Sequence, residues 1–369
     1  MSNSSILILS NSIGGLYNFR KEVIKSVVDS GFTVCICCPA GKQFKMDYFT
    51  GIGCELSVVP IDRRGINPFH DIVLFSKYFR LLRKLKPLAV LTYTIKPNVY
   101  GGIAARFLGV PQLANITGLG TSIQDGGWLK RLTVSLYRFG LKKAQVLFYQ
   151  NSAIRDFCID NKIGRQGILL PGSGVNLDSF TFQEYPAADQ PVKFFMIGRI
   201  MKDKGVEEFF HMASSIHDRY PDVEFHILGG CEEKYEDGIK ELQSKGILIW
   251  HGSVPDTCPY LKEAWCVIHP SYHEGMSNVL QECCASGRPA IACDINGCKE
   301  IIKDGVNGYL CEVRSSESLL NAVEKFINLP YEQKVAMGHE ARRVVEESFD
   351  RNLISDAYLK EIKKIVQHV

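Results

Sequence analysis

The sequence lacks a strong net charge and a long apolar run. With 43 Lys and Arg residues against 40 Asp and Glu, its formal net charge is only +3, which is too small to indicate a nucleic-acid-binding protein. The short apolar run that ends at Leu9 has no basic residues before it, and no other run is long enough to cross a bilayer. We therefore expect a cytoplasmic protein.

The dinucleotide-binding fingerprint and a disulfide framework are also missing. Gly14 and Gly15 follow the first predicted strand but are adjacent, not spaced as G-x-G-x-x-G, and the second strand ends at Cys38 without an acidic residue for a ribose. A nicotinamide cofactor is therefore disfavoured, and the two glycines form either a phosphate-binding loop or an ordinary turn. The odd number of cysteines, 13, favours reduced thiols that serve in packing.

Short apolar runs alternate with longer helical stretches along the whole chain, a pattern typical of parallel α/β sheets. Strands are expected near residues 6–10, 34–38, 56–59, 89–91, 113–116 and 146–149, and again near 192–197, 224–228, 247–250, 267–269 and 290–293. The polar, aperiodic stretch 181–190 between the two sets indicates an interdomain linker. We predict an α/β protein with two Rossmann-like doubly wound domains, residues 1–181 and 191–349, that face a central cleft at the carboxyl ends of their strands.

The stretch Ser271–Gly287 places two carboxylates around a predicted helix start. Glu274 lies on a loop just before a glycine, and Glu282 lies about one turn inside a helix that Ser277 or Asn278 would cap. Such a helix start offers unpaired N–H groups and a partial positive charge to a phosphate, while both glutamates can accept sugar hydroxyls. The alternative is a surface loop and an ordinary capped helix with two solvated glutamates.

The N–H groups expected to be unpaired at that helix start belong to Asn278, Val279 and Leu280. Gly275 lies beside them and has no side chain to block the approach of an anion.

Two cations follow the first strand of the second domain. Arg199 and Lys204 lie in G-R-I-M-K-D-K-G between this strand and a helix expected from about Val206. They would place positive charge at the carboxyl edge of the sheet, where a diphosphate would bind. Alternatively, Arg199 is a surface residue beside Asp203. Further glycine-rich or polar loops, 229–230 and 251–255, follow other strands of this domain, so several candidate groups converge on one sheet edge.

These residues resemble the retaining, nucleotide-sugar-dependent glycosyltransferases of glycosyltransferase family 4, which have the two-domain GT-B fold. The resemblance spans nearly the whole chain and rests on segments 171–176 (P-G-S-G-V-N), 198–205, 269–282 (H-P-S-Y-H-E-G-M-S-N-V-L-Q-E), 287–302 (G-R-P-A-I-A-C-D-I-N-G-C-K-E-I-I) and 304–310 (D-G-V-N-G-Y-L). Two others, 92–101 (T-Y-T-I-K-P-N-V-Y-G) and 115–121 (N-I-T-G-L-G-T), are similar to the subgroup that builds bacterial capsules, O-antigens and lipid-linked oligosaccharides.

The resemblance implies roles for individual residues. Arg199 and Lys204 would neutralise the donor diphosphate as it leaves, Glu282 would bind the donor ribose, and Glu274 would hold the transferred sugar; the catalytic group is thus Arg199, Lys204 and Glu274. The other implied donor-binding residues are Gly14, Gly15, Gly198, Ser253, Val254, Gly275, Met276, Ser277 and Asn278. Fixed cations and a helix N-terminus can replace a metal ion, and the first half has no D-x-D motif at its strand ends, so neither a metal nor a cofactor is expected.

The acceptor side is expected in the first domain. Many members of the family have a histidine near the anomeric carbon, in the stretch that reads Tyr93–Pro97 here. Lys96 lies where such a polar catalytic group would be expected. Lys96 would bind an acceptor phosphate, orient the donor, or be a solvated loop lysine. Thr117 and Gly118 are assigned to the acceptor side with it. The family also implies that residues 350–369 cross back to the first domain.

The function implied is retaining transfer of a sugar from a nucleotide diphosphate, with a UDP-sugar as the expected donor, to a lipid-linked or saccharide acceptor in bacterial surface polysaccharide or glycoconjugate synthesis. The alternatives are a nucleotide-sugar 2-epimerase of the same fold and a non-catalytic nucleotide-sugar-binding protein. Two basic, amphipathic stretches, Phe75–Lys86 and Trp128–Lys143, either cover the sheet or attract anionic lipid. A peripheral position on the inner face of the cell membrane is favoured.

Overall fold

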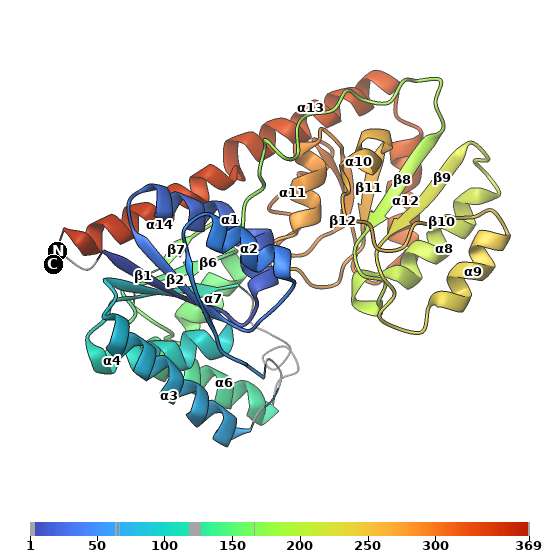
Figure 1. The fold of residues 1–369 in the computed structure, drawn as a ribbon. Helices are drawn as coiled ribbons and strands as arrows, with labels where there is room; N and C mark the ends of the chain where they lie inside the picture. The colour runs from blue at the N-terminus through green and yellow to red at the C-terminus, as the bar shows by residue number, and fades with distance from the viewer. Residues whose placement is uncertain (1–3, 63–64, 66, 118–126, 166, 368–369) are drawn as a thin grey trace. The chain divides into compact units, whose positions relative to one another are not determined.

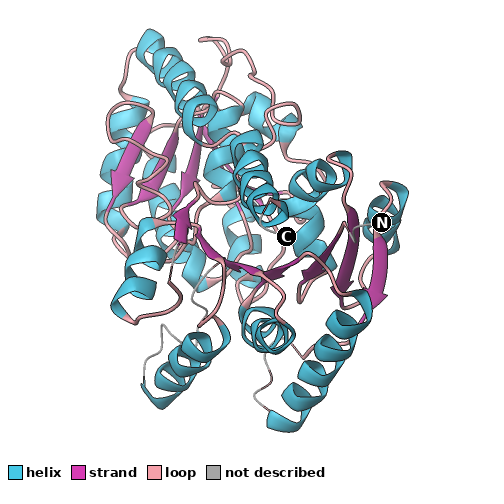
Figure 2. Ribbon diagram, turned by 90° about the vertical axis from the view of Figure 1, so that its left-hand side faces the viewer, coloured by secondary structure: helices cyan, strands magenta, loops and turns pink. Residues whose placement is uncertain are grey.

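The computed structural model describes residues 4–62, 65, 67–117, 127–165 and 167–367. The chain forms two compact units, one made of Met1–Ser173 with Arg351–Val369 and the other of Gly174–Asp350 (Figure 1). Both are parallel-sheet α/β domains with helices on the two faces of a sheet (Figure 2). The predicted fold class is confirmed.

The first unit contains a seven-stranded parallel sheet in the order β3-β2-β1-β4-β5-β6-β7. The strands are β1 (Ser5–Leu9), β2 (Thr33–Cys38), β3 (Glu55–Val58), β4 (Ala89–Tyr93), β5 (Gln112–Ile116), β6 (Val146–Tyr149) and β7 (Gly167–Leu169). The helices are α1 (Ile13–Asp29), α2 (Gln43–Gly51), α3 (Pro68–Leu85), the π-helix η1 (Pro97–Gly101), α4 (Gly102–Leu108), α6 (Gly127–Gly140), α7 (Ser152–Asp160) and α14 (Arg351–Val366). The direction of winding reverses between β1 and β4.

The second unit contains a six-stranded parallel sheet in the order β10-β9-β8-β11-β12-β13. The strands are β8 (Val192–Ile197), β9 (Val223–Leu228), β10 (Ile249–Trp250), β11 (Cys266–His269), β12 (Ala290–Cys293) and β13 (Gly308–Cys311). The helices are the 3₁₀ turn η2 (Lys202–Lys204), α8 (Val206–His217), α9 (Glu236–Ser244), α10 (Cys258–Glu263), α11 (Asn278–Ala285), α12 (Ser316–Ile327) and α13 (Tyr331–Ser348). Here the winding reverses between β8 and β11.

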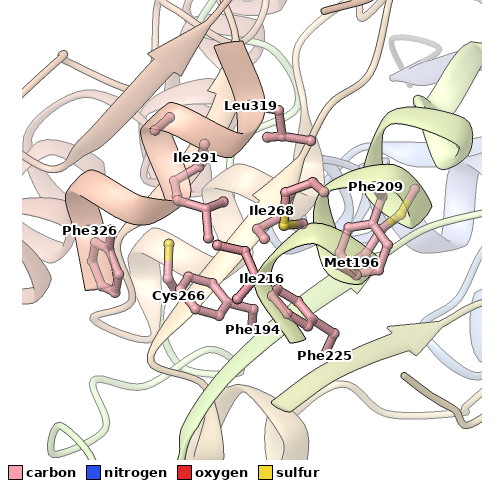
Figure 3. Packing of buried hydrophobic residues seen from close by; sticks show 14 of the residues in the cluster. Phe194, Met196, Phe209, Ile216, Phe225, Cys266, Ile268, Ile291, Leu319 and Phe326 are labelled. Atoms are coloured by element: carbon pink, nitrogen blue, oxygen red, sulfur yellow. The ribbon is translucent and has the colours of Figure 1, made fainter. Parts of the chain in front are cut away.

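The second sheet is buried on both faces, which explains why β8 is a continuous apolar run. Phe194 and Met196 point into one apolar cluster, and Phe195 and Ile197 into another on the opposite face. In the first cluster the rings of Phe194 and Phe225 stack with centroids 5.5 Å apart, and helices α8 and α12 cover them (Figure 3). The carboxyl ends of the strands are thereby fixed on a rigid sheet.

The predicted linker, residues 181–190, is part of the second unit, which begins at Gly174. The side chain of Arg288 is fully buried, and its Nη1 and Nη2 donate to the carbonyl oxygens of Gln183 and Glu184 at 2.8 and 2.7 Å. The Tyr185 hydroxyl donates to the carbonyl oxygen of Trp265 at 2.6 Å. Lack of periodicity therefore marked an extended segment that is attached to one unit, not a free linker.

The C-terminal segment forms one helix, α14, which belongs to the first unit. The ring of Tyr358 stacks on Phe148 of β6 with centroids 4.3 Å apart, and its hydroxyl donates to Asn115 of β5. At the start of the helix, Arg351 Nη1 lies 2.9 Å from Glu22 Oε2 of α1.

Two features differ from the sequence-based expectations: the start of helix α1 and the presence of two short strands. Helix α1 begins at Ile13, so Gly14 and Gly15 lie in its first turn and not in a loop before it. Strands β7 and β13 were not predicted, because each has only three or four residues and begins with glycine. No helix in the described ranges is long and apolar enough to cross a membrane.

Candidate functional site

Two loops of the second unit meet where the winding of the sheet reverses. The loop after β8 contains Lys204, and the loop after β11 contains Glu274. Lys204 Nζ lies 2.5 Å from Glu274 Oε1, and His269 Nε2 lies 2.9 Å from the same oxygen. Open α/β sheets bind their ligands at this reversal point, outside the carboxyl ends of the strands.

Backbone contacts hold these two loops together. Gly205, directly after Lys204, has φ of 71°, and a Cβ there would overlap the carbonyl oxygen of Pro270. The amide of Tyr272 donates to the carbonyl oxygen of Asp203 at 2.9 Å. Only a glycine permits this close approach, which sets the ammonium of Lys204 beside Glu274.

The carboxylate of Glu274 is held in its charged form. Burial raises the pKa of Glu274, but the hydrogen bond and charge of His269 and the charge of Lys204 outweigh it and lower the pKa to about 2. An ionised carboxylate only accepts hydrogen bonds, so the Nε2 atom of His269 carries the proton that lies between them. The same nitrogen lies 3.1 Å from the Ser277 hydroxyl. The solvated-glutamate alternative is wrong for Glu274.

Helix α11 begins beside this cluster. Ser277 is its N-cap, and its hydroxyl accepts from the amide of Leu280 at 3.3 Å. The predicted cap is confirmed, but the amide of Leu280 is consequently occupied. The amides of Asn278 and Val279, at the first two positions of the helix, have no acceptor one turn earlier in the helix and remain suited to an anion.

Arg199 lies on the same sheet edge but apart from this ion pair. Its Nη1 is 2.8 Å from Glu232 Oε2, and both side chains are about half exposed, at 55% and 50%. Arg199 is thus a surface residue, as the alternative had it, but its partner is Glu232 and not Asp203. An exposed ion pair contributes little free energy, typically ~1 kcal/mol or less, so an incoming anion can displace Glu232 at small cost.

Backbone hydrogen bonds join the loops after β8, β9 and β10 at this edge of the sheet. The amide of Gly198 donates to the carbonyl oxygen of Leu228, and the amide of Gly229 donates to that of Gly252. A Cβ on Gly230 would lie 2.8 Å from the hydroxyl oxygen of Ser253, so the expected nucleobase loop adjoins the glycine loop.

Replacing Gly229 with alanine is expected to abolish donor binding. Gly229 has φ of 152°, and a Cβ there would overlap the carbonyl oxygen of Gly198, so the loops after β8 and β9 would separate. Thermal shift with nucleotide sugars measures the loss. Gly238→Ala is the control, because Gly238 lies in α9 with open space around it. A normal donor-induced shift in Gly229→Ala would contradict this account.

Other predicted donor residues of the second unit have mixed environments. The side chain of Met276 is buried in an apolar cluster, and Val254 packs against that cluster, so only their backbone atoms are suited to polar contacts. Glu282 is half-buried on α11. Burial, then the hydrogen bond and charge of Asp256, and then the charge of Glu282 raise the pKa of Cys258 to about 11, which places Glu282 near the start of α10. Gly275 is half-buried between Glu274 and Met276.

In the first unit, Gly14 and Gly15 form the start of α1, where the Ser12 hydroxyl accepts from the amide of Gly15 at 3.1 Å. A Cβ on Gly14 would lie 3.8 Å from Lys45 Nζ. Lys45 is a cation beside this helix start that sequence reasoning missed. No sequence motif marks it, because it belongs to α2, which packs against α1 only in the folded chain.

Lys96 is not a solvated lysine. Its Nζ lies 2.7 Å from Asp71 Oδ1, and the two side chains are only 14% and 13% exposed. The Tyr100 hydroxyl donates to the other oxygen of Asp71 at 2.7 Å. Thr117 is half-buried after β5, and Gly118 lies outside the described residues. Asp71 and Tyr100, like His269, were not predicted, although His269 lies only two residues before the stretch on which the prediction centred.

Both domains of the chain match family models of glycosyltransferases. Residues 178–344 match the family model described as "Glycosyl transferases group 1", and residues 14–170 match a "Glycosyl transferase 4-like domain". The chain is 25% identical over 384 residues to N,N'-diacetylbacillosaminyl-diphospho-undecaprenol alpha-1,3-N-acetylgalactosaminyltransferase of Campylobacter jejuni, with 98% of this chain and 99% of the relative covered. It is 26% identical over 288 residues to UDP-Gal:alpha-D-GlcNAc-diphosphoundecaprenol alpha-1,3-galactosyltransferase of Escherichia coli, with 72% and 73% covered.

Solved structures share the fold. A glycosyltransferase from Rickettsia africae superposes with a TM-score of 0.80 at 17% identity, covering 99% of both chains. The Anabaena protein HepE, solved in complex with UDP and glucose, superposes with a TM-score of 0.77 at 17% identity, covering 98% of this chain and 99% of that one. The two sheets, the ion-paired site and these matches define a glycosyltransferase with the GT-B fold. The two family models together match residues 14–170 and 178–344, so both domains of the chain are similar to glycosyltransferase domains.

Proposed function

We propose that the protein is a retaining, metal-independent glycosyltransferase that moves a sugar from a UDP-sugar to a lipid-linked acceptor during bacterial surface polysaccharide or glycoconjugate synthesis. The observation that supports this most is the ion-paired cluster of Lys204, Glu274 and His269 at the reversal point of the second sheet. This cluster offers a cation, a fixed carboxylate and a helix start at one edge of the second sheet. These are the groups that a sugar diphosphate requires.

In the proposed reaction the bond between the sugar and the donor diphosphate breaks, and the acceptor oxygen bonds to the same face of the sugar. Negative charge develops on the diphosphate, where the ammonium of Lys204 and the amides of Asn278 and Val279 stabilise it. The leaving phosphate takes the acceptor proton. Glu274 accepts hydrogen bonds from the transferred sugar, and Arg199 moves from Glu232 to the diphosphate. This distribution of roles uses fixed protein charges and needs no metal ion.

The remaining roles follow the sequence-based prediction. Glu282 binds the ribose, Gly198, Ser253 and Val254 surround the nucleotide, and Gly14 and Gly15 contribute phosphate contacts. The uridine nucleotide is supported by the relative from Escherichia coli, whose name specifies UDP-Gal. The lipid-linked acceptor is supported by both curated relatives, whose names specify sugars on diphospho-undecaprenol.

The direct test combines a donor panel with product analysis. Nucleotide sugars are ranked by thermal shift, since a bound donor stabilises the native state in proportion to its affinity and concentration. The best donor is then incubated with and without a polyprenyl-diphosphate sugar. A disaccharide on the lipid with the donor's anomeric configuration supports the proposal. An epimerised nucleotide sugar formed without acceptor would identify a 2-epimerase, and tight donor binding without turnover would identify a binding protein.

We also propose peripheral contact with the cytoplasmic membrane face through the first unit. Apolar positions within the predicted stretch Phe75–Lys86, such as Phe75 and Phe79, are partly buried against the sheet, so that stretch covers the core. Exposed apolar side chains lie instead on the first turns of α3 and on α6, where Trp128 and Phe139 accompany the exposed Arg131. Mixed apolar and basic surfaces bind anionic lipid. Sedimentation with vesicles containing 30% phosphatidylglycerol tests this, and equal binding to neutral vesicles would contradict it.

A further inference from the structure

The carboxyl end of β4 contains a polar cluster that the donor site does not use. Asp71 of α3 binds Lys96 Nζ through one oxygen and the Tyr100 hydroxyl through the other, both at 2.7 Å. Two charges so far removed from water lose much of their hydration, so the pair is weak evidence of a contribution to stability. The cluster lies at the reversal point of the first sheet, between β1 and β4, where such sheets bind ligands.

The backbone beside this cluster is strained. Thr94, which follows β4, has φ of 74°, a conformation that β-branched residues strongly disfavour. The π-helix η1 begins three residues later, at Pro97, and single π-helical turns occur frequently at functional sites. Together these features turn the chain so that Lys96 and Tyr100 both reach Asp71. A surface salt bridge would need no such arrangement.

Asp71 fixes the direction of the Lys96 ammonium. An ammonium has three N–H donors, and Asp71 accepts from one of them, which leaves the others available to a second anion. The Tyr100 hydroxyl occupies the other oxygen of Asp71, which prevents the carboxylate from rotating. The ion pair thereby presents a lysine in one orientation without leaving an unpaired charge buried when no ligand is bound.

Exposed apolar side chains flank the largely buried Asp71 on the same helix. Phe69 is 76% exposed, Ile72 61% and Val73 53%, all within the first two turns of α3. A ligand that fits both features is amphiphilic, with an anionic group for the lysine and a hydrocarbon chain for the apolar turns.

We infer that Asp71 is a positioning residue that holds Lys96 to receive the diphosphate of a polyprenyl-linked acceptor, whose hydrocarbon chain lies along Phe69, Ile72 and Val73. This inference rests on the proposed function and specifies its acceptor side. Charge complementarity supports the anionic part, and the adjacency of the exposed apolar turns supports the hydrocarbon part. Asp71 acts through Lys96 and does not itself contact the acceptor.

A double-mutant cycle tests the positioning role. Lys96→Met is expected to raise the acceptor KM by about 10–100-fold, the effect of losing a charged hydrogen bond, with a much smaller change in kcat. Asp71→Asn should raise the acceptor KM in the wild-type background but have no further effect in Lys96→Met. Hydrolysis of the donor without acceptor is measured for comparison, because Lys204 and Glu274 lie in the second unit. A loss of hydrolysis as large as the loss of transfer would show that the substitutions disturb donor binding instead. Additive effects of the two substitutions on the acceptor KM would overturn the inference.

Folding is controlled within the same experiment. Thermal unfolding is measured for each variant, and Lys96→Arg, which keeps the charge, should retain most of the acceptor affinity. If Lys96→Met does not fold, Tyr100→Phe replaces it: loss of one hydrogen bond to Asp71 should raise the acceptor KM by about 3–10-fold with normal donor hydrolysis. An unchanged acceptor KM in Tyr100→Phe would then refute the inference.

The hydrocarbon part is tested with two acceptors that share a sugar diphosphate but carry a long polyprenyl chain or a short alkyl chain. Phe69→Ser with Ile72→Ser should raise KM about tenfold or more for the long chain only, from the loss of apolar burial. Ile159→Ser, an equally exposed apolar residue on α7, is the control. Equal losses for both acceptors would overturn this part.

Two further outcomes separate related explanations. If Lys96→Met loses binding to anionic vesicles but keeps its acceptor KM in detergent, the site receives bulk phospholipid and the inference is wrong. If the wild-type protein transfers no sugar from any nucleotide donor to either acceptor, the proposed function itself fails, independently of the cycle.

Discussion

Lys204→Met is expected to lower kcat/KM for sugar transfer by about 10²–10³-fold, the usual effect of removing one fixed charge that stabilises a leaving group. Lys204 lies where the sheet winding reverses, and its ammonium is held 2.5 Å from Glu274 Oε1. In the proposed reaction this ammonium faces the donor diphosphate, and its attraction increases as the sugar bond breaks and charge develops. The effect should therefore appear in kcat more than in donor affinity. Steady-state kinetics with a saturating acceptor measures it.

Lys202→Met is the matched control. Lys202 lies on the same 3₁₀ turn, but it is 61% exposed and its Nζ is 3.6 Å from Glu207 Oε2, away from the Glu274 cluster. Its replacement should change kcat/KM by less than about threefold, as expected for an exposed ion pair. Similar losses in both variants would show that net charge near the sheet edge matters and that Lys204 has no specific role.

Glu274→Gln is expected to destabilise the second unit by about 3 kcal/mol at neutral pH. The pKa of Glu274 is lowered from 4.5 to about 2, and each unit of difference between unfolded and folded states corresponds to ~1.4 kcal/mol. Because the folded pKa is the lower one, this stability is fully present above pH 4.5 and is lost as the pH falls towards 2. The difference between wild type and variant should therefore shrink between pH 5 and pH 3.

Urea unfolding at several pH values, followed by the fluorescence of Trp250 and Trp265 of the second unit, measures this difference. Glu232→Gln is the control, since Glu232 pairs with Arg199 at the exposed surface and its loss should cost ~1 kcal/mol or less. A constant gap between Glu274→Gln and wild type from pH 7 to pH 3 would show that packing, and not the charge of Glu274, stabilises the loop. Sugar transfer by Glu274→Gln should also be reduced, because the amide donates where the carboxylate only accepted.

The fold could be predicted because its causes are local. Each buried parallel strand is a short apolar run, such as Val192–Ile197, and each loop at a strand end is polar or glycine-rich. Alternation of strands and helices then leaves few possible topologies for a parallel sheet. The proximity of Lys204 and Glu274 could be predicted for the same reason, since both follow strands and parallel strands bring their carboxyl ends to one edge.

The pairing of individual side chains could not be predicted. Arg199 pairs with Glu232, 33 residues away, and not with its neighbour Asp203, because the loops after β8 and β9 are adjacent in the sheet. Similarly, the partner of Lys96 is Asp71, 25 residues earlier on α3. Neither Glu232 nor Asp71 lies in a recognisable motif. Such contacts depend on the packing of a helix or loop against its sheet, which the sequence pattern does not encode.

The sequence alone therefore determined the class of fold and the sheet edge at which Lys204 and Glu274 meet. The tertiary structure decided which charges are paired and how far each is removed from water. It showed that Lys96 is a nearly buried, oriented cation and that Phe69 and Ile72 are exposed beside its partner. The physical reason is that periodicity and strand order arise from neighbouring residues, whereas burial and ion pairing arise from surfaces that only folding brings together.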